Sequence, residues 1–325
     1  MRQNMSKELT VEATAKLLQN VKSIILASHI GPDGDTLGST LALAEGLKQL
    51  GKNVQIMVDD KISFTYSFMP GITDYIFPQT GDKYEADLLV IIDASSLDRI
   101  GLVDECVEAK QVLNIDHHIS NTRYAEYLLL NSMAAAVGEM MYVLLKEMQV
   151  KITPSIATNL YVAIATDSGY FKYSNTTPQT MRLAAELLEL GVKPNDVSDC
   201  LEVKSQATIN LLKVVLNTLT FYAEGKIATI EIDHEHYDKE VDTDSFIYYP
   251  RYIYGVDVAA CLKAVEPDVT RVSMRAKSVD VSKIALSFNG GGHKKAAGCT
   301  INAPLAEAKA QLLKAVEKEM HSTND

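Results

Sequence analysis

The stretch that decides the fold reads Ser23-Ile24-Ile25-Leu26-Ala27-Ser28-His29-Ile30-Gly31-Pro32-Asp33-Gly34-Asp35. Its apolar first half predicts a buried β-strand that ends at His29. The same pattern, an apolar run that stops at an acidic or histidine residue, recurs at Asn53–Val58, Leu88–Ile92, Val112–Ile115 and Tyr161–Thr166. Helical patterns lie between these runs, at Thr36–Leu50, Val137–Met148 and Thr180–Leu190. This alternation predicts an α/β domain with a mostly parallel sheet.

The loop after the first strand is the sharpest local signal for chemistry. Two glycines and a proline force a tight turn, so His29, Asp33 and Asp35 converge. Imidazole combined with carboxylates suits Mn²⁺, Zn²⁺ or Fe²⁺, whereas carboxylates and water alone would suit Mg²⁺. The loop therefore predicts a metal site. The alternative interpretation is an Asx-type turn with a helix cap at Asp35 or Thr36.

Three later apolar runs also end at residues that can bind metal, namely Asp93, Asp116-His117-His118 and Asp167. In a parallel sheet, ligands bind beyond the carboxyl ends of the strands. We therefore expect four separate strands to bring these residues to one edge of the sheet. In the histidine pair, one imidazole can bind a metal while Asp116 orients it, and the other can approach a substrate phosphate. A solvent-exposed turn is the alternative for this pair.

The chain divides into two predicted domains. Residues 1–194 contain all of these strands, and a glycine and a proline, Gly191 and Pro194, close the last helix. A helical linker is predicted at residues 195–219. A strand at Lys226–Ile232 then begins a second, smaller α/β domain, residues 220–325, which has a glycine-rich turn near its end.

The composition restricts the partners of the protein. The chain has 42 acidic and 31 basic residues, a formal net charge of −11. Proteins that clamp long duplex nucleic acid usually carry a basic excess, so we expect small phosphorylated ligands instead. No apolar run approaches the roughly 18–20 residues that span a bilayer, so no membrane association is expected. The four cysteines show no CxxC spacing, which favours free thiols in a cytoplasmic protein.

Four motifs appear in order along the chain: His29-x3-Asp33-x-Asp35, Ile92-Asp93-Ala94-Ser95, Asp116-His117-His118 and Ala165-Thr166-Asp167-Ser168-Gly169. This order resembles that of the DHH phosphoesterase superfamily. The C-terminal part resembles the DHH-associated domain, through residues 271–277 (RVSMRAK) and 290–298 (GGGHKKAAG). Within the superfamily, the chain is most similar to the group of bifunctional oligoribonucleases and 3′-phosphoadenosine-5′-phosphate phosphatases. Residues 171–177 and 249–256 resemble motifs of that group.

The resemblance implies that residues 1–194 form a catalytic domain with two divalent metal ions, for which we expect Mn²⁺. One ion would be held by His29 and Asp33, the other by Asp35, His117 and Asp167, and Asp93 would bridge them. A shared carboxylate can hold two cations roughly 3.5–4 Å apart, the spacing of two-metal phosphoryl chemistry. The implied catalytic residues are Asp93, Asp116 and His118, and His118 would compensate charge on the phosphoryl oxygens.

The resemblance assigns substrate binding to the second domain. The run Gly290-Gly291-Gly292 with His293 resembles a backbone cradle for phosphate, and Arg275 can hold a phosphate bidentately. Further candidates for substrate contact are Ser174, Asn175 and Arg251. The alternatives are a flexible turn for the glycines and surface positions for the arginines.

The implied function is metal-dependent hydrolysis of short oligoribonucleotides to mononucleotides and of 3′-phosphoadenosine 5′-phosphate to AMP. Alternatives in the same superfamily are a phosphodiesterase of linear or cyclic dinucleotides and an inorganic pyrophosphatase or polyphosphatase. A nucleotide sensor without activity would not need six metal ligands, which argues against it. A RecJ-type exonuclease on long DNA is disfavoured by the size and acidity of the chain. A homodimer is a further expectation.

Overall fold

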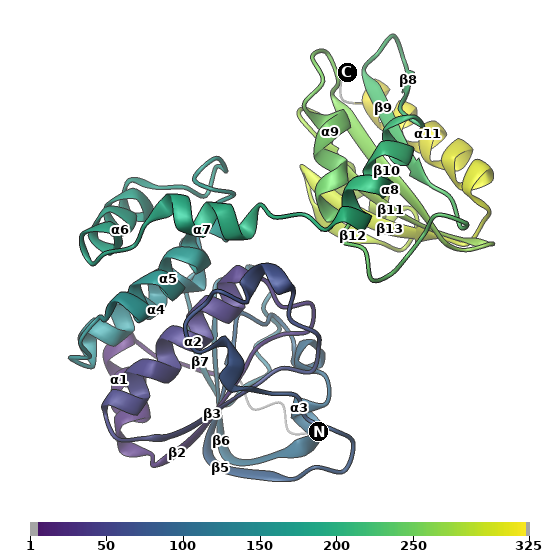
Figure 1. Ribbon diagram of the computed structural model, residues 1–325. Coiled ribbons are helices and arrows are strands. Elements are labelled where there is room, and N and C mark those ends of the chain that lie inside the picture. Colours follow the sequence, from purple (N-terminus) through teal and green to yellow (C-terminus); the bar gives the residue numbers. More distant parts are fainter. Residues whose placement is uncertain (1–5, 323–325) are drawn as a thin grey trace. The chain divides into compact units, whose positions relative to one another are not determined.

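The computed structural model of the protein describes residues 6–322 (Figure 1). The chain separates into two compact units, Met1–Val203 and Lys204–Asp325. The division falls within the predicted linker, so helix α7 (Pro194–Leu201) belongs to the first unit and α8 (Gln206–Leu216) to the second. Within residues 6–322, no helix is both long enough and apolar enough to span a bilayer.

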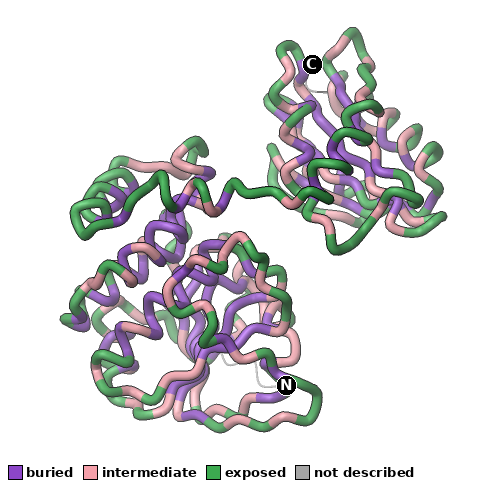
Figure 2. The backbone as a smooth tube through the Cα atoms, in the orientation of Figure 1, coloured by how far each residue is buried: buried purple, intermediate pink, exposed green. Residues whose placement is uncertain are grey.

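The first unit contains a seven-stranded sheet in the order β1-β7-β6-β5-β2-β3-β4. Every neighbouring pair of strands is parallel, which confirms the predicted sheet type. The strands are β1 (Lys7–Glu8), β2 (Ser23–Ala27), β3 (Asn53–Met57), β4 (Tyr75–Ile76), β5 (Tyr84–Ile92), β6 (Val107–Asp116) and β7 (Tyr127–Leu130). Figure 2 shows that the buried segments of this unit follow the strands and the helix faces turned toward them.

Helices cover both faces of this sheet because its strands are apolar on both sides. In β2, Ile24 and Leu26 belong to one core and Ile25 and Ala27 to another, as expected when successive side chains point to opposite faces. The larger core is shared with α1 (Val11–Asn20), α2 (Gly34–Gln49), α4 (Val137–Glu147) and α5 (Pro154–Asp167). The smaller core is shared with the short helices η3 (Leu97–Ile100) and α3 (Val103–Cys106).

The sheet order reverses between β2 and β5. From β2 the chain continues to β3 and β4 on one side, whereas from β5 it continues to β6 and β7 on the other. In doubly wound α/β sheets, such a reversal opens a crevice outside the carboxyl ends of the strands. His29 follows β2 and Asp93 follows β5, so both of these predicted ligands lie at the reversal.

One predicted strand is wrong. Tyr161–Thr166 lies in helix α5, so Asp167 comes from the C-terminus of a helix and only three strands supply the predicted ligands. The helix begins where Thr153 accepts a hydrogen bond from the amide of Ile156, followed by Pro154 in its first turn. Residues 159–165 are all buried, so the segment lacks the polar face that usually marks a helix in sequence.

The second unit contains a six-stranded mixed sheet in the order β12-β13-β11-β10-β9-β8. Its strands are β8 (Thr220–Tyr222), β9 (Ile227–Ile232), β10 (Val258–Glu266), β11 (Val269–Ala276), β12 (Gly291–His293) and β13 (Ala296–Ile301). One core lies against α10 (Val281–Leu286) and α11 (Leu305–Ser322). A second core lies on β9 and β10, against α8, η4 (Asp244–Ile247) and α9 (Tyr248–Arg251).

The remaining elements of the first unit are α6 (Pro178–Glu189) and the one-turn helices η1 (Phe64–Tyr66) and η2 (Ile72–Asp74). Helix α6 begins with a capping box, in which Thr177 and Thr180 each accept a hydrogen bond from the other's amide. This cap fixes the end of the segment that follows Asp167.

Close packing of α2 on α5 requires a glycine at position 38. A Cβ atom at Gly38 would lie 2.2 Å from the carbonyl oxygen of Asn159, whereas one at Gly46 would meet side-chain methyl groups, that of Leu145 at 2.3 Å and that of Val150 at 3.3 Å. We expect Gly38→Ala to lower the free energy of unfolding of the first unit by about 1–3 kcal/mol through overpacking. Gly46→Ala is the matched control and should cost less, because Leu145 can move. Urea unfolding of both variants tests this, and equal stabilities would contradict it.

Candidate metal centre

Asp33 both caps a helix and faces the predicted metal site. Gly31 adopts the left-handed conformation (φ 63°) and turns the chain after β2. Oδ1 of Asp33 then accepts hydrogen bonds from the amides of Asp35 (3.0 Å) and Thr36 (3.1 Å), which makes Asp33 the N-cap of α2. The same oxygen lies 3.7 Å from Nε2 of His29. The alternative cap at Asp35 or Thr36 is therefore wrong, and the cap is compatible with the metal site.

Asp35 is buried in the first turn of α2 and points at the start of another helix. Its carboxylate accepts hydrogen bonds from the amides of Val137 (2.6 Å) and Gly138 (2.9 Å), the first residues of α4. These amides lack partners within their own helix and lie at its positive end. Burial, with the negative charges of Asp93 and Asp167, nevertheless raises the pKa of Asp35 well above its usual value. A bound cation would offset this repulsion.

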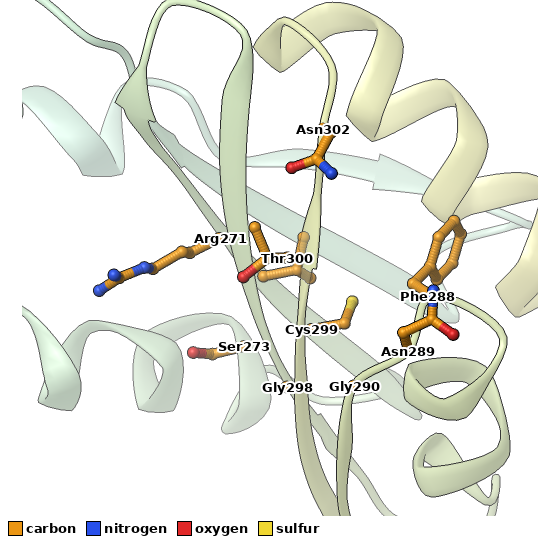
Figure 3. Close-up of a pocket in the computed structure, with 10 residues that line it drawn as sticks. Arg271, Ser273, Phe288, Asn289, Gly290, Gly298, Cys299, Thr300 and Asn302 are labelled. Atoms are coloured by element: carbon orange, nitrogen blue, oxygen red, sulfur yellow. The ribbon is translucent and has the colours of Figure 1, made fainter.

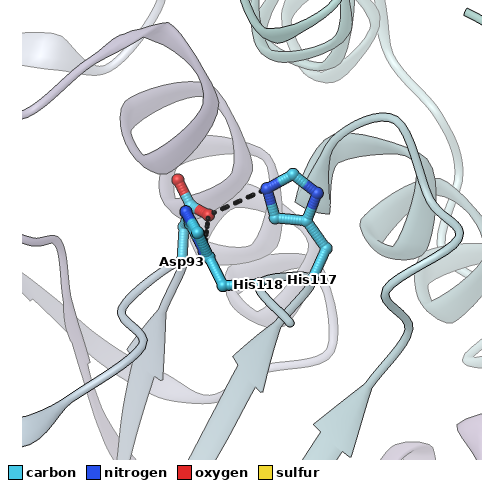
Figure 4. A group of neighbouring side chains, drawn as sticks. All are labelled: Asp93, His117 and His118. Carbon is cyan, nitrogen blue, oxygen red and sulfur yellow. Dashed lines mark ion pairs between the residues drawn. The ribbon is translucent and has the colours of Figure 1, made fainter. Parts of the chain in front are cut away.

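Asp93 is the central residue of the site. It follows β5 in the left-handed conformation (φ 59°), which is strained for a residue other than glycine and is held by a hydrogen bond from its amide to Ile115. The carboxylate is almost fully buried. Oδ2 lies 3.6 Å from Nε2 of His29, while Oδ1 lies 3.6 Å from Nε2 of His117 and 3.5 Å from Nδ1 of His118 (Figure 4). Asp93 thus faces imidazoles on both sides.

The two histidines of the Asp116-His117-His118 motif have different partners. Oδ1 of Asp116 accepts a hydrogen bond from Nδ1 of His118 (2.7 Å), and this bond raises the pKa of His118. The ring of His117 instead donates from Nδ1 to the carbonyl of Ala134 (3.1 Å), which leaves Nε2 for a metal. The prediction that Asp116 orients the metal-binding imidazole is therefore wrong: Asp116 orients the second one.

Asp167 lies at the end of α5 and is held by its surroundings. The side-chain amide of Asn175 donates to the carbonyl oxygens of Asp167 and Ala135, both at 3.1 Å. Burial and the nearby Asp93 carboxylate raise the pKa of Asp167 to about 6, against the lowering effect of His117. Asn175, predicted to bind substrate, thus fixes the backbone of a predicted ligand, while Ser174 beside it is exposed.

The six predicted ligands lie in two groups, which a third group connects through Asp93 and His117. Within each group, one ligand atom from each residue lies within 4.8 Å of the others. The first group is His29, Asp33 and Asp93, the second is Asp35, His117 and Asp167, and Asp93 also lies in a third group with His117 and His118. Two cation positions that meet at Asp93 fit this arrangement.

The site residues fit divalent cations by a second criterion. Oδ1 of Asp93 is buried and makes no hydrogen bond. A buried carboxylate oxygen without a partner is costly unless a cation or a donor reaches it. Asp33, Asp35, Asp93 and Asp167 add four negative charges to a small volume, and a pair of divalent cations would balance them. The site can therefore bind divalent metal ions.

Arg99 was missed in the sequence. Its guanidinium lies 3.0 Å from Nδ1 of His29, and its carbonyl accepts a hydrogen bond from the amide of Ile30 (2.7 Å). The same Nδ1 lies 2.9 Å from the carbonyl of Ile30, so the imidazole can donate there and present Nε2 to a metal. The only signal in the sequence is an arginine six residues after Asp93, which is too common a feature to single out.

The second unit holds the remaining predicted residues. The predicted glycine turn is wrong: Gly291–His293 form the edge strand β12, paired with β13. A Cβ at Gly290 would lie 2.3 Å from the carbonyl oxygen of Gly298. The close approach of the chain to β13 therefore requires a glycine at position 290. Arg275 donates to the carbonyl of Met274, and its guanidinium lies 6.0 Å from the Tyr248 ring. The buried Nε of Arg251 makes no hydrogen bond.

The first unit thus has the architecture of a doubly wound α/β enzyme domain with a histidine–aspartate centre at its sheet reversal. The "DHH family, N-terminal domain" model matches residues 23–164, and the "DHHA1 domain" model matches residues 226–322. The bifunctional oligoribonuclease and PAP phosphatase NrnA of Thermus thermophilus is 34% identical over 94% of this chain and 93% of its own length. The protein of the same name from Bacillus subtilis is 29% identical, over 86% and 89%.

A solved structure has the same fold. An exopolyphosphatase-related protein from Bacteroides fragilis superposes with a TM-score of 0.88 at 24% identity, covering 97% of each chain. The chain belongs to the DHH family and carries a C-terminal DHHA1 domain. The six residues of the two metal groups come from the motifs on which the family resemblance rests.

Metal binding should release protons. Burial lowers the pKa of His29, but the carboxylates of Asp33 and Asp93 outweigh this and raise it to about 10. At pH 8 the metal-free imidazole is therefore protonated, whereas a metal requires it neutral, so we expect about one proton to be released. Metal affinity should rise with pH until about pH 10. Calorimetry in buffers of different ionisation enthalpy measures the released protons.

The matched variants are His29→Gln, which should remove the proton release at pH 8, and His236→Gln, which should keep it. His236 is exposed and pairs with Asp233 at 2.7 Å, far along the chain from the site. Metal binding to the unaltered protein at pH 8 without proton release would contradict the assignment of His29 as a ligand.

Proposed function

We propose that the protein is a metal-dependent phosphoesterase that hydrolyses short oligoribonucleotides to mononucleotides and 3′-phosphoadenosine 5′-phosphate to AMP. The observation that carries this proposal is the pair of ligand groups joined by the buried carboxylate of Asp93. Membership of the DHH family and full-length similarity to relatives named oligoribonuclease and PAP phosphatase support the substrates. These relatives are hydrolases, and this chain is one as well.

The residues of the site divide the chemistry between them. His29 and Asp33 would hold one cation, Asp35, His117 and Asp167 the other, and Asp93 both. Two bound divalent cations supply charge compensation and a water of lowered pKa. We infer Mn²⁺ because imidazoles and carboxylates together suit it better than they suit Mg²⁺, which prefers an all-oxygen site.

His118 is the residue that we expect to contact the phosphate. Its hydrogen bond to Asp116 raises its pKa and fixes one ring nitrogen, so the protonated ring can donate from Nε2 to a phosphoryl oxygen. Its side chain is 40% exposed, whereas those of Asp93 and Asp116 are almost fully buried. A substrate can therefore reach His118 from solvent, while Asp116 acts through it.

The net charge of the chain favours short, flexible substrates over long polyanions. A net charge of −11 opposes the approach of long polyanions, and a duplex would gain little from counterion release. We also infer a cytoplasmic location, which the four free cysteines support, three of them buried.

Asp93→Ala should abolish turnover, because both ions lose their shared ligand. We expect a loss of at least about a hundredfold in kcat, with lower metal content by elemental analysis. Asp199→Ala, which removes an exposed carboxylate on α7, is the matched control and should behave like the unaltered protein. The assay is a Mn²⁺-dependent panel of oligoribonucleotides of two to ten residues, 3′-phosphoadenosine 5′-phosphate and pyrophosphate.

On this panel we expect the highest kcat/KM for oligomers of a few residues and little hydrolysis of duplex. Chelator should abolish activity and Mn²⁺ should restore it. Full activity in excess chelator would contradict the metal mechanism. Pyrophosphate as the best substrate would instead favour the pyrophosphatase alternative.

We also propose that Arg275 and His293 bind substrate, together with the glycines of residues 290–292. Loss of a charge-assisted contact to phosphate weakens binding by about ten- to a hundredfold. Arg275→Ala and His293→Ala should therefore raise KM by this amount and leave metal content unchanged. Arg182→Ala, on the exposed face of α6, is the control. Unchanged kinetics in both variants would show that the β12–β13 region serves only the fold.

A further inference from the structure

The sheet of the second unit has one uncovered region. The core under α8, η4 and α9 lies on β9 and β10, and it includes no residue of β11, β12 or β13. On β11, Val272, Met274 and Ala276 are buried against α10 and α11. Arg271, Ser273 and Arg275 alternate with them, so they point to the opposite face, where η4 and α9 lie beside Arg275.

A hollow of about 540 Å³ lies beside the Arg271 end of β11, and its lining includes Arg271 and Thr300 from this face and Phe288 and Cys299 from the other (Figure 3). Its floor is formed by small residues on neighbouring strands, since Ser273 is the register partner of Gly298. Its wall contains polar side chains, Arg271, Thr300 and Asn302. Pockets of a few hundred Å³ with a few polar groups are typical of small-ligand sites. The size fits one nucleotide unit better than an extended polymer.

Four polar side chains of this hollow have no partner among the described residues. In residues 6–322, the side chains of Arg271, Ser273, Thr300 and Asn302 make no hydrogen bond or ion pair. By contrast, Arg275 is engaged with Met274 and Tyr248, and Lys263 pairs with Asp244 at 3.2 Å. A set of unengaged donors around one hollow is what an incoming polar ligand would require.

The charge of the hollow selects an anion. Arg271 lies directly opposite Lys263 in the β10–β11 register and opposite Thr300 in the β11–β13 register. Like charges in facing positions of neighbouring strands repel each other. Asp244 compensates Lys263 in part, whereas Arg271 has no counter-ion in the described part of the chain. A phosphate beside Arg271 would relieve the repulsion and accept a bidentate pair of hydrogen bonds.

The edge of β13 adds backbone groups to the hollow. Strand β12 pairs with β13 only at residues 296–298, so residues 299–301 have no strand partner on that side among residues 6–322. Unpaired backbone N–H and C=O groups at a strand edge can hydrogen-bond a ligand. Ribose hydroxyls are suitable partners, because the 2′-OH both donates and accepts.

The hollow is separate from the site around Arg275. Arg271 and Arg275 are four residues apart on one strand, so their Cα atoms lie about 13 Å apart. A smaller hollow of about 210 Å³, lined by Lys263, Ser273 and Arg275, lies on the β10 side of β11, next to η4. Ser273 lines both hollows, so they are adjacent. One strand of RNA that passes from one to the other would place different phosphates beside the two arginines.

We propose that Arg271, Ser273 and Thr300 form a second phosphate-and-ribose subsite, which holds an additional nucleotide of oligoribonucleotides longer than two residues. The subsite rests on the proposed function, because it extends the substrate bound at Arg275. Because only longer oligomers reach the subsite, it raises the affinity of the enzyme for them. A mononucleotide such as 3′-phosphoadenosine 5′-phosphate cannot fill both hollows, so the subsite adds least to its binding affinity.

The test measures kcat/KM for oligoribonucleotides of two, three and four residues with Mn²⁺. In Arg271→Gln, the loss should grow with length, so that the ratio of tetramer to dimer kcat/KM falls about tenfold or more. The slope of log affinity against log salt for the tetramer should decrease by about 0.7, as expected for one lost phosphate contact to a single strand. Arg182→Gln should change neither quantity.

A second pair of variants tests the charge without removing the arginine. Thr300→Glu places a carboxylate opposite Arg271 and should produce the same length-dependent loss, and this loss should be larger than that of the uncharged variant Thr300→Gln. Both changes fall on an exposed strand position, so folding should be preserved. An unchanged tetramer-to-dimer ratio in both Arg271→Gln and Thr300→Glu would overturn the proposal.

Failure of the proposed function has a different result. If the unaltered protein hydrolyses no oligoribonucleotide with Mn²⁺, the function is wrong. Fluorescence anisotropy of a labelled tetranucleotide with the unaltered protein and with Arg271→Gln then tests the subsite alone. Equal affinities for the two proteins would overturn the subsite, and weaker binding to Arg271→Gln would support it.

Discussion

Mutual repulsion among buried carboxylates is the constraint on which the first unit depends. Asp35 and Asp93 are almost fully buried, and Asp33 and Asp167 lie within a few ångströms of the same place. Burial, together with their proximity, raises the pKa of Asp35 and of Asp167, which means that the metal-free site resists full ionisation. The fold tolerates this cost because helix amides and imidazoles surround the carboxylates, and a metal pair would remove it.

The sheet topology explains why these charges meet. The reversal between β2 and β5 brings two loops with different ligands to adjacent strand ends, and β6 adds the histidine pair beside them. The N-terminus of α4 holds Asp35 from one side, and the end of α5 supplies Asp167. The cores on both faces of the sheet anchor all of these ends, so small shifts of a ligand would require movement of buried strands.

Much of this arrangement could be predicted from the sequence. Apolar runs that stop at His29, Asp93 and Asp116 marked real strand ends, and the parallel sheet followed from the alternation of strands and helices. Asp167 was misplaced onto a strand because α5 is buried along most of its length, so its sequence has no polar periodicity. Local spacing predicted that His29, Asp33 and Asp35 converge. It could not predict contacts between loops that are far apart in the sequence.

Those distant contacts decide the roles within the site. Asp116 is bonded to His118 and not to the ring of His117, and this depends on how the loop after β7 approaches His117 through Ala134. Arg99 reaches His29 from a one-turn helix 70 residues later in the chain. Neither arrangement leaves a pattern in the sequence, because residue type and spacing do not specify which of two neighbouring rings a carboxylate will contact.

The second unit shows why net charge alone is a poor guide to substrate. The chain is strongly acidic as a whole, yet Arg271, Arg275 and Lys263 lie on one face of one sheet. Screening confines the effect of surface charges to roughly 8–10 Å at physiological salt, so a local cationic face can bind phosphate despite the net charge. The surrounding acidity then acts on whatever extends beyond that face. A strand short enough to stay on it is attracted, and a longer one is increasingly repelled, which favours short substrates without any steric barrier.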